Sequence, residues 1–253
     1  MAPRAPTADD VVTAITSTWA LFGAHLDGAW ARDFGRTLAV VVGVPVPTFN
    51  AVWVTDPDTR PEDVEKALST VASSGLPHCV QLRPGCDPEI TDVVWGAGLT
   101  LEGSVPLMAA AATPPLPQPA GLVIRELEHD ETLVHTALAA PVFGMPEDMF
   151  ASLMTSTMAM PEAHAYVGAV DGVPVVTAIS VWIAGAVGIF NVATPTEYRR
   201  RGYGAAITEH VLRDGLSNGA DWGWLQSSDA GYGVYGSLGF ATLERWECWI
   251  SAT

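Results

Sequence analysis

The sequence predicts an α/β protein of the α+β kind, with two similar domains that each contain a mixed, mostly antiparallel sheet flanked by helices. Three observations lead to this prediction. A proline-rich segment divides the 253-residue chain into halves of similar length. Short sequence words recur in the two halves at one constant spacing. Strand-like and helix-like patterns alternate in both halves.

The proline-rich segment AAATPPLPQPAG runs from Ala110 to Gly121 and contains four prolines and no charged residue. This composition is typical of a stiff, extended connection between domains. We therefore expect a first domain over residues 1–112, a linker over 113–121 and a second domain over 122–253.

Two pairs of words support a duplication. FNAVWVTDP begins at Phe49 and FNVATP at Phe190, while GLTLE begins at Gly98 and GFATLE at Gly239. Both pairs are 141 positions apart, and each half reads between them as strand, polar turn, helix, second strand and short helix. Chance similarity in a biased composition is the alternative to duplication.

The second half can be read element by element. Asp171-Gly172 is a two-residue hairpin turn, and Asn218-Gly219 ends a helix whose apolar residues recur every three to four positions. The expected elements are a strand at 121–127, helices at 130–140 and 146–158, a hairpin of 163–170 and 173–183, a strand at 186–194, a helix at 202–217, a strand at 222–228, a short helix at 230–238 and a last strand at 241–251.

Composition excludes several classes of protein. The formal charge of −16, from 12 basic and 28 acidic residues, would repel nucleic acid. No apolar run approaches the roughly 20 residues that a membrane span needs. The odd cysteine count (Cys79, Cys86 and Cys248), without C-x-x-C or metal-ligand spacing, favours a reduced cytoplasmic compartment and no metal. We expect a monomer with an internal pseudo-dimer, or a homodimer.

The segment EYRRRGYGAA, residues 197–206, places three of the twelve basic residues beside two glycines at the start of a predicted helix. A helix start exposes unpaired N–H groups and partial positive charge, which attract anions. Gly202 and Gly204 lack Cβ atoms and would let a phosphate approach the amides. The segment therefore predicts a diphosphate cradle; a solvated basic turn with a glycine N-cap is the alternative. It matches neither the P-loop nor the Rossmann pattern.

The spacing R-x-x-G-x-G from Arg199 to Gly204, after a strand and before a long helix, resembles the acyl-CoA loop of the GNAT acetyltransferase superfamily. The later SSDAGYGVYGSLGF resembles that superfamily's downstream segment, where a polar residue, a tyrosine seven positions on and an L-G-F turn follow a strand. The resemblance covers the chain from about residue 122 onward. One departure is that the superfamily often has its proline one residue nearer the arginines than Pro195.

The resemblance implies acetyl-CoA as acyl donor and gives roles to particular residues. The main chain of Val192, Ala193 and Thr194 would pair with the pantetheine arm, and Ser228 would lie near the cofactor. Tyr235 would give a proton to the departing CoA thiolate, which suits a side chain with a pKa near 10; a packing tyrosine is the alternative. The diphosphate would be held by Arg199, Arg200, Arg201, Gly202, Tyr203, Gly204 and Ala205.

The 141-residue spacing suggests that the first copy lacks this site. Residues 58–63, DTRPED, replace RRRGYG, so that Pro61 and Asp63 stand in place of the two glycines. Carboxylates at a helix start satisfy the dipole and repel a diphosphate. Val94 replaces Tyr235 and cannot donate a proton. We expect the first copy to be degenerate and to serve as a packing partner or a wall of the acceptor pocket.

The sequence identifies the acceptor side less well. Glu162 and His164 are candidate bases, with ordinary solvated side chains as the favoured alternative, and His210 is expected to be a surface or packing residue. Five methionines in residues 143–163 could line an apolar acceptor site or form a buried helix face. The expected function is acetyl transfer from acetyl-CoA to a small-molecule amine by direct attack in a ternary complex. The alternatives are a CoA-binding regulatory or scaffold protein without turnover, and an acetyltransferase acting on a protein amine.

Overall fold

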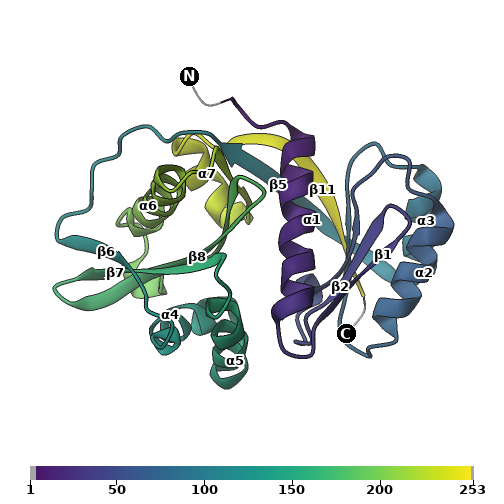
Figure 1. Cartoon of the computed structure of the whole chain (residues 1–253), viewed down its shortest axis with the longest axis horizontal. Coiled ribbons are helices and arrows are strands. Elements are labelled where there is room, and N and C mark those ends of the chain that lie inside the picture. The colour runs from purple at the N-terminus through teal and green to yellow at the C-terminus, as the bar shows by residue number, and fades with distance from the viewer. Residues whose placement is uncertain (1–3, 252–253) are drawn as a thin grey trace. The chain divides into compact units, whose positions relative to one another are not determined.

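The computed structural model describes residues 4–251, which divide into two compact units (Figure 1). The C-terminal unit comprises residues up to Ala14 together with Met108–Ala241. The N-terminal unit comprises Ile15–Leu107 together with the residues from Thr242 onward. The domain boundaries at 112 and 122 stay a prediction.

The C-terminal unit contains a sheet of order β10-β9-β8-β7-β6 in which only β9 and β10 run parallel. This is the mixed, mostly antiparallel sheet that the sequence predicts. Its strands are β6 (Leu122–Glu126), β7 (Ala163–Val170), β8 (Val173–Ile183), β9 (Ala186–Ala193) and β10 (Trp222–Gln226). Its helices are α4 (Thr132–Phe143), α5 (Glu147–Met158), α6 (Tyr203–Ser217), α7 (Asp229–Ser237) and the 3₁₀ helix η2 (Thr196–Tyr198).

Local sequence signals account for most of these boundaries. Asp171 and Gly172 have φ values of 51° and 78°, the left-handed pair that a two-residue hairpin requires. On α6, the fully buried Ile207 and Val211 pack in the core of the unit, and Asn218 caps the C-terminus. The expected end of α4 at residue 140 is wrong, because the helix continues through Pro141 to Phe143.

The N-terminal unit contains a sheet of order β1-β2-β3-β4-β11 in which β3 and β4 are parallel. Its core lies between the sheet and two helices, α2 and α3. The elements that lie wholly or partly in this unit are α1 (Ala8–His25), β1 (Trp30–Phe34), β2 (Thr37–Val41), the 3₁₀ helix η1 (Pro47–Phe49), β3 (Asn50–Val54), α2 (Pro61–Ala72), β4 (Cys79–Leu82), α3 (Pro88–Gly96), β5 (Leu99–Ala110) and β11 (Ala241–Ser251).

The last strand of the chain belongs to the sheet of the N-terminal unit. Strand β11 pairs antiparallel with β4, with Glu247 opposite Leu82 and Ile250 opposite Cys79. Trp249 is buried in the core of that unit. The preceding element, α7, belongs to the C-terminal unit. The final strand of the chain therefore completes the sheet of the N-terminal unit, so folding of that unit requires residues from the other end of the sequence.

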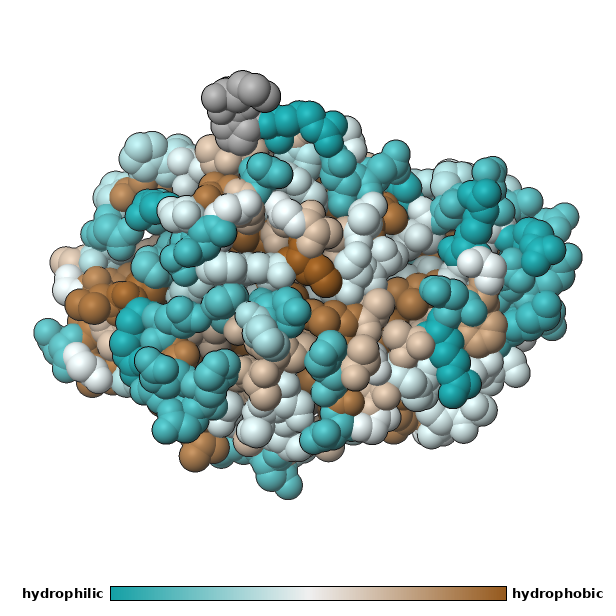
Figure 2. All heavy atoms as spheres, in the orientation of Figure 1, coloured by the Kyte–Doolittle hydropathy of each residue, from teal (hydrophilic) through white to brown (hydrophobic). Residues whose placement is uncertain are grey.

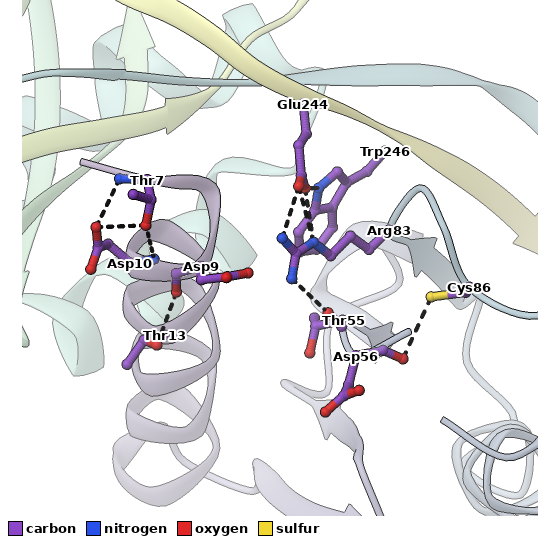
Figure 3. Close-up of polar contacts among 10 residues, drawn as sticks. All are labelled: Thr7, Asp9, Asp10, Thr13, Thr55, Asp56, Arg83, Cys86, Glu244 and Trp246. Atoms are coloured by element: carbon purple, nitrogen blue, oxygen red, sulfur yellow. Dashed lines mark hydrogen bonds and ion pairs between the residues drawn. The ribbon is translucent and has the colours of Figure 1, made fainter. Parts of the chain in front are cut away.

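A largely buried ion pair fixes β11 to the first half (Figure 3). The Arg83 guanidinium, which follows β4, donates to both carboxylate oxygens of Glu244 at 2.8–3.1 Å and to the Thr55 carbonyl at 3.2 Å. Trp246 Nε1 donates to the same carboxylate at 2.8 Å. The two charged side chains are only 12% and 17% exposed. Removing either partner would leave the other buried without its counter-charge.

We expect Arg83→Ala to lower the free energy of unfolding by about 3 kcal/mol, because Glu244 would remain buried and unpaired. Urea unfolding followed by tryptophan fluorescence measures this change. Arg125→Ala, which breaks the exposed pair with Glu131, is the matched control and should shift the midpoint much less. Equal urea midpoints for the two variants would contradict a larger contribution to stability from the Arg83–Glu244 pair than from the exposed pair.

The order strand, helix, parallel strand, short helix, long strand occurs in both halves, as the sequence predicts. The second pair of words also matches in structure: Gly98 and Gly239, with φ values of 85° and 88°, each follow the short helix. The first pair does not match, because Asn50 begins β3 whereas Asn191 lies near the end of β9. The duplication stays a prediction, supported by the element order and the second pair of words.

Hydrophilic side chains are spread over the face seen in Figure 2, with scattered apolar ones between them. None of the helices within residues 4–251 combines the length and the apolar character that crossing a bilayer requires.

Candidate functional site

Strand β9 separates from β10 after a short contact. The parallel ladder joins Ala186–Gly188 to Trp222–Trp224, and within the described residues it goes no further. The register between β8 and β9 then shifts by one residue, since Ile179 lies opposite Phe190 but Thr177 lies opposite Ala193. Asn191, inside this bulge, has a φ of 50°. The end of β9 therefore has an open edge, to which an extended chain with amide groups could add.

The three residues expected to pair with the pantetheine arm lie along this edge. Ala193 is fully buried, and Val192 packs against the core of the C-terminal unit. The Thr194 carbonyl accepts a hydrogen bond from Arg199 Nε at 3.0 Å. A carbonyl has two lone pairs, so this bond leaves one acceptor position free.

The loop after η2 turns twice through the left-handed region before α6 begins. Arg200 has a φ of 65°, and Gly202, the N-cap of α6, has a φ of 81°. Among the described residues, the N–H groups of Arg200 to Ala205 donate no hydrogen bond, and the first amide of the helix that donates is Ala206, to the Gly202 carbonyl at 3.0 Å. A run of unpaired amides at a helix N-terminus is an anion site.

The arginines of the loop carry uncompensated charge. Arg199, Arg200 and Arg201 are exposed, and in the part of the chain that the structure describes none of them pairs with a carboxylate. Arg201 donates to the Glu197 carbonyl at 3.1 Å and lies 6.0 Å from the centre of the Tyr198 ring. Six other arginines do form ion pairs with carboxylates: Arg4, Arg36, Arg60, Arg83, Arg125 and Arg213. In so acidic a chain, three unpaired guanidinium groups on one loop favour an anionic ligand there.

The two glycines of the loop serve different purposes. Gly202 is required by its positive φ. Gly204 has an ordinary helical backbone, and a Cβ at this position would have only the Thr194 hydroxyl nearby, at 3.6 Å. The fold could accept a side chain at position 204, so the bare backbone there is best explained by close approach of a ligand. The neighbouring Tyr203 is buried and packs in the core, and Ala205 is half-buried against it.

Tyr235 lies on α7 and packs against the same core as Tyr203. Its ring lies over Gly231, one turn earlier: a Cβ at position 231 would be 2.6 Å from Tyr235 Cε2. Burial raises the pKa of Tyr235 to about 12, so the phenol stays protonated at neutral pH. Sequence reasoning missed this contact of Gly231 with the Tyr235 ring, although the spacing G-x-x-x-Y is visible in the sequence.

Ser228 is the N-cap of α7, and its hydroxyl accepts a hydrogen bond from the Gly231 N–H at 3.3 Å. This bond orients the first turn of the helix that carries Tyr235. The proximity of Ser228 to a cofactor stays a prediction.

The proline-rich linker packs along the same region of the C-terminal unit. Thr113, Leu116 and Pro119 are half-buried, at the three-residue period of a polyproline helix. Pro119 lies 3.6 Å from where a Gly202 Cβ would be, and Pro114 lies 3.4 Å from the corresponding point on Gly239. The linker therefore runs from the end of α7 to the N-cap of α6, beside the elements that carry Tyr235 and the arginine loop.

The corresponding helix start in the N-terminal unit carries a buried carboxylate. Asp63, in the first turn of α2, is buried and accepts hydrogen bonds from Arg60 Nε and Nη2 at 3.1 and 3.0 Å. A Cβ on Gly35 would lie 2.2 Å from the same carboxylate. Val94, which stands in place of Tyr235, is fully buried. This end of α2 has an internal anion where α6 has unpaired amides.

A buried histidine lies against strand β8 where β9 bulges. His135 Nδ1 is 2.6 Å from the Thr177 hydroxyl, which itself donates to the Tyr166 carbonyl at 2.8 Å. A carbonyl can only accept, so the hydroxyl proton is used there and Nδ1 of His135 must be the donor. His135 Nε2 then bears the lone pair, and it is buried without a partner. His135 thus holds Thr177, the residue paired with Ala193.

Burial lowers the pKa of His135 to about 4, below the unfolded value of 6.5. Its contribution to stability is therefore complete above pH 6.5 and is lost as the pH falls toward 4, because the unfolded chain binds the proton first. We expect the wild type to lose about 2 kcal/mol between pH 7.5 and pH 5 relative to His135→Asn, whose amide can still donate to Thr177. Urea unfolding at both pH values measures this difference, and parallel pH profiles for the two proteins would contradict it.

The candidate bases of the acceptor side lie elsewhere in the unit. His164 Nδ1 is 2.7 Å from Glu126 Oε1, and the ring stacks on Trp182. Its cross-strand partner Ser180 lies opposite Ile189, two residues before Asn191. His210 packs edge-on against Tyr166, and burial lowers its pKa. Neither histidine is placed at the bulge.

The methionine-rich helix is mainly part of the core. Met154, Met158 and Met160 are buried, as expected of an ordinary helix face, and Met145 and Met149 are half-buried. Asn191 Nδ2 lies 3.9 Å from Met154 Sδ, so α5 touches the bulge of β9. Within residues 4–251, no group of three or more His, Cys, Asp or Glu side chains is placed to hold a metal ion.

Comparison with known proteins identifies the fold. No protein-family model matches the sequence, and no curated protein is significantly similar to it. A GCN5-related N-acetyltransferase from Kribbella flavida is similar in structure, with a TM-score of 0.76 and 20% identity over 98% of this chain and 97% of that chain. One from Sphaerobacter thermophilus has a TM-score of 0.63 and 16% identity over 98% and 94%. A tandem GNAT protein from the clavulanic acid biosynthesis pathway has a TM-score of 0.57 and 14% identity over 98% and 97%.

The chain therefore has the GCN5-related N-acetyltransferase fold over nearly its whole length. This confirms the fold that the resemblance of the arginine loop and the tyrosine segment implies, and a tandem GNAT protein is among the similar structures.

Proposed function

We propose that the protein is an N-acetyltransferase that moves the acetyl group of acetyl-CoA to a small-molecule amine by direct attack in a ternary complex. The observation that carries the proposal is the loop from Arg199 to Ala205, with its unpaired amides, its unpaired guanidinium groups and the bare backbone at Gly204. These features together fit a diphosphate. The open edge of β9 next to the loop fits the amide-bearing pantetheine arm.

Bound acetyl-CoA supplies a thioester carbonyl for attack by the amine. The loop amides and arginines hold the diphosphate, and the main chain from Val192 to Thr194 orients the arm beside the sheet. The amine nitrogen bonds to the acetyl carbon as the C–S bond breaks. Tyr235 keeps a proton on its phenolic oxygen at neutral pH and gives it to the departing sulfur. Water carries away the proton that the amine loses and returns one to Tyr235. Asn191, in the bulge of β9 and close to Met154 of α5, would lie on the acceptor side under this proposal.

The N-terminal unit has no part in coenzyme binding under this proposal, because the buried Asp63 carboxylate in the first turn of α2 would repel a diphosphate. We place the protein in the cytoplasm, as a monomer or a homodimer, with no nucleic-acid partner.

A thiol-release assay tests the proposal. The protein is incubated with acetyl-CoA and a panel of small primary amines, and free CoA is measured over time. Release that depends on the amine and is lost in Tyr235→Phe supports transfer to a small molecule. Coenzyme binding without release for any amine would replace the proposal with a CoA-binding regulatory protein. Release with peptide amines alone would move the acceptor to a protein.

A further inference from the structure

The N-terminal unit contains a polar cavity that has no part in the proposed reaction. It has a volume of about 460 Å³, within the range of small-molecule sites. Helix α1 and the hairpin of β1 and β2 form its walls, and Thr55, just after β3, closes one side. The side chains that matter for recognition are Ser17, Ala20, Asp33, Arg36, Leu38 and Thr55.

A carboxylate without a partner lies on one wall. Asp33 is opposite Leu38 in the hairpin, so both side chains project from the same face of the sheet, and both line the cavity. Among the described residues, the Asp33 carboxylate makes no hydrogen bond and no ion pair, although Arg36 lines the same cavity only three residues away. The Asp33 carboxylate is therefore available to a cation.

Arg36 is already compensated, and its orientation is fixed. Its Nη1 lies 2.6 Å from Asp56 Oδ2 and 3.7 Å from Asp58 Oδ2. Within the described chain no contact uses Nε or Nη2, so these groups can donate to an oxygen acceptor. With two carboxylates beside one guanidinium, Arg36 contributes directed N–H groups and no net positive charge. Together with Asp33, the surroundings of the cavity are negative.

The remaining walls set the size and polarity of the ligand. Ser17 on α1 is half-buried, and in the described residues its hydroxyl has no partner. Ala20 and Leu38 provide a short aliphatic surface. A cation close to Asp33, an oxygen near Arg36 and a hydroxyl near Ser17 would satisfy all three polar groups together.

We propose that this cavity binds a small hydroxylated primary amine, an amino alcohol or amino sugar, with the ammonium on Asp33 and its oxygens on Arg36 and Ser17. The net charge of −16 favours capture of such a cation from solution. The site uses no residue of the arginine loop, so it stands or falls independently of the proposed acetyl transfer. The N-terminal unit would then have an amine site of its own.

Protein-observed NMR of the full chain without coenzyme tests the proposal. The amines are ethanolamine and glucosamine, at low ionic strength, and ethylene glycol is the uncharged comparison. We expect saturable chemical-shift changes of the backbone amides of Ser17, Asp33 and Arg36. The Kd should be roughly millimolar, because an ion pair between exposed charges contributes little binding energy. Ethylene glycol should leave these amides unchanged.

Asp33→Asn should raise the Kd measured from these amides at least about tenfold. Asp92→Asn removes an equal charge from an exposed position on α3, away from the cavity, and should bind as the wild type does. Equal affinity in the two variants would overturn the proposal. Chemical-shift changes confined to the C-terminal unit would also overturn the proposal. If glycine, a zwitterion, bound as tightly as ethanolamine, the assignment to amino alcohols would be overturned.

Discussion

Gly204→Asp is expected to abolish measurable coenzyme A binding while the protein keeps its fold. The Cβ of the new side chain has room, since its nearest neighbour would be the Thr194 hydroxyl at 3.6 Å. Its carboxylate, however, would stand at the start of α6 where the diphosphate is proposed to bind. Two like charges 4 Å apart near a protein surface repel by about 4 kcal/mol, which corresponds to about a thousandfold in Kd.

Gly103→Asp is the matched control, because a Cβ at this exposed position in β5 meets no atom within 4 Å and adds the same charge far along the chain. Gly204→Ala separates size from charge and should cost less affinity than the aspartate does. Calorimetric titration with CoA gives each Kd, and circular dichroism verifies the fold. Retained micromolar binding by Gly204→Asp would mean that the loop holds something other than the coenzyme.

Tyr235→Phe is expected to lower kcat by about 10²–10⁴-fold, the usual contribution of a positioned acid, and to leave the Kd for CoA nearly unchanged. The hydroxyl is the only group removed, and the ring packing against Phe240 stays. Steady-state kinetics and calorimetry on the same preparation separate the two quantities. An unchanged kcat would remove Tyr235 from the proton-transfer role.

Two glycines of α7 sharpen the test of Tyr235. A methyl group at Gly231 would lie 2.6 Å from the Tyr235 ring, and the ring can swing away, so Gly231→Ala should displace Tyr235 without unfolding the helix. Gly233→Ala adds the same methyl group to the same helix, where nothing lies within 4 Å. We expect kcat to fall in the first variant and to be retained in the second.

The elements of the second half were largely predictable because their signals are local. The pair Asp171-Gly172 fixes a hairpin turn through its positive φ angles, and Gly202 and Asn218 mark the ends of α6 through their capping geometry. The end of α4 was not predictable in this way. Proline at position 141 disfavours a continuing helix locally, yet the helix runs to Phe143 before Gly144 ends it.

Features that depend on distant partners were not predictable from local patterns. The residues of β11 read as a strand, but nothing in them indicates that β4 would be the neighbour or that Glu244 would meet Arg83 across 161 positions. His135 reads as one more residue of a helix, and its bond to Thr177 appears only when α4 packs on β8. In the candidate site, the arginine loop was visible in sequence, whereas the ring of Tyr235 over Gly231 was not.

The two units show how one helix start can be used in two ways. At α6 the amides are unpaired, and three arginines beside them lack carboxylate partners within the described residues. At α2 the buried Asp63 occupies the corresponding position and takes both bonds from Arg60. An internal carboxylate and an external diphosphate satisfy the same partial charge, so we expect each unit to accept only one of them.

Calorimetric titration of the full chain with coenzyme A tests this account most directly. The account predicts one molecule bound per chain, with heat that disappears in Gly204→Asp and persists in Gly103→Asp. Two molecules per chain would contradict the loss of coenzyme binding in the N-terminal unit. No binding at all would contradict the assignment of the arginine loop and, with it, the proposed acetyl transfer.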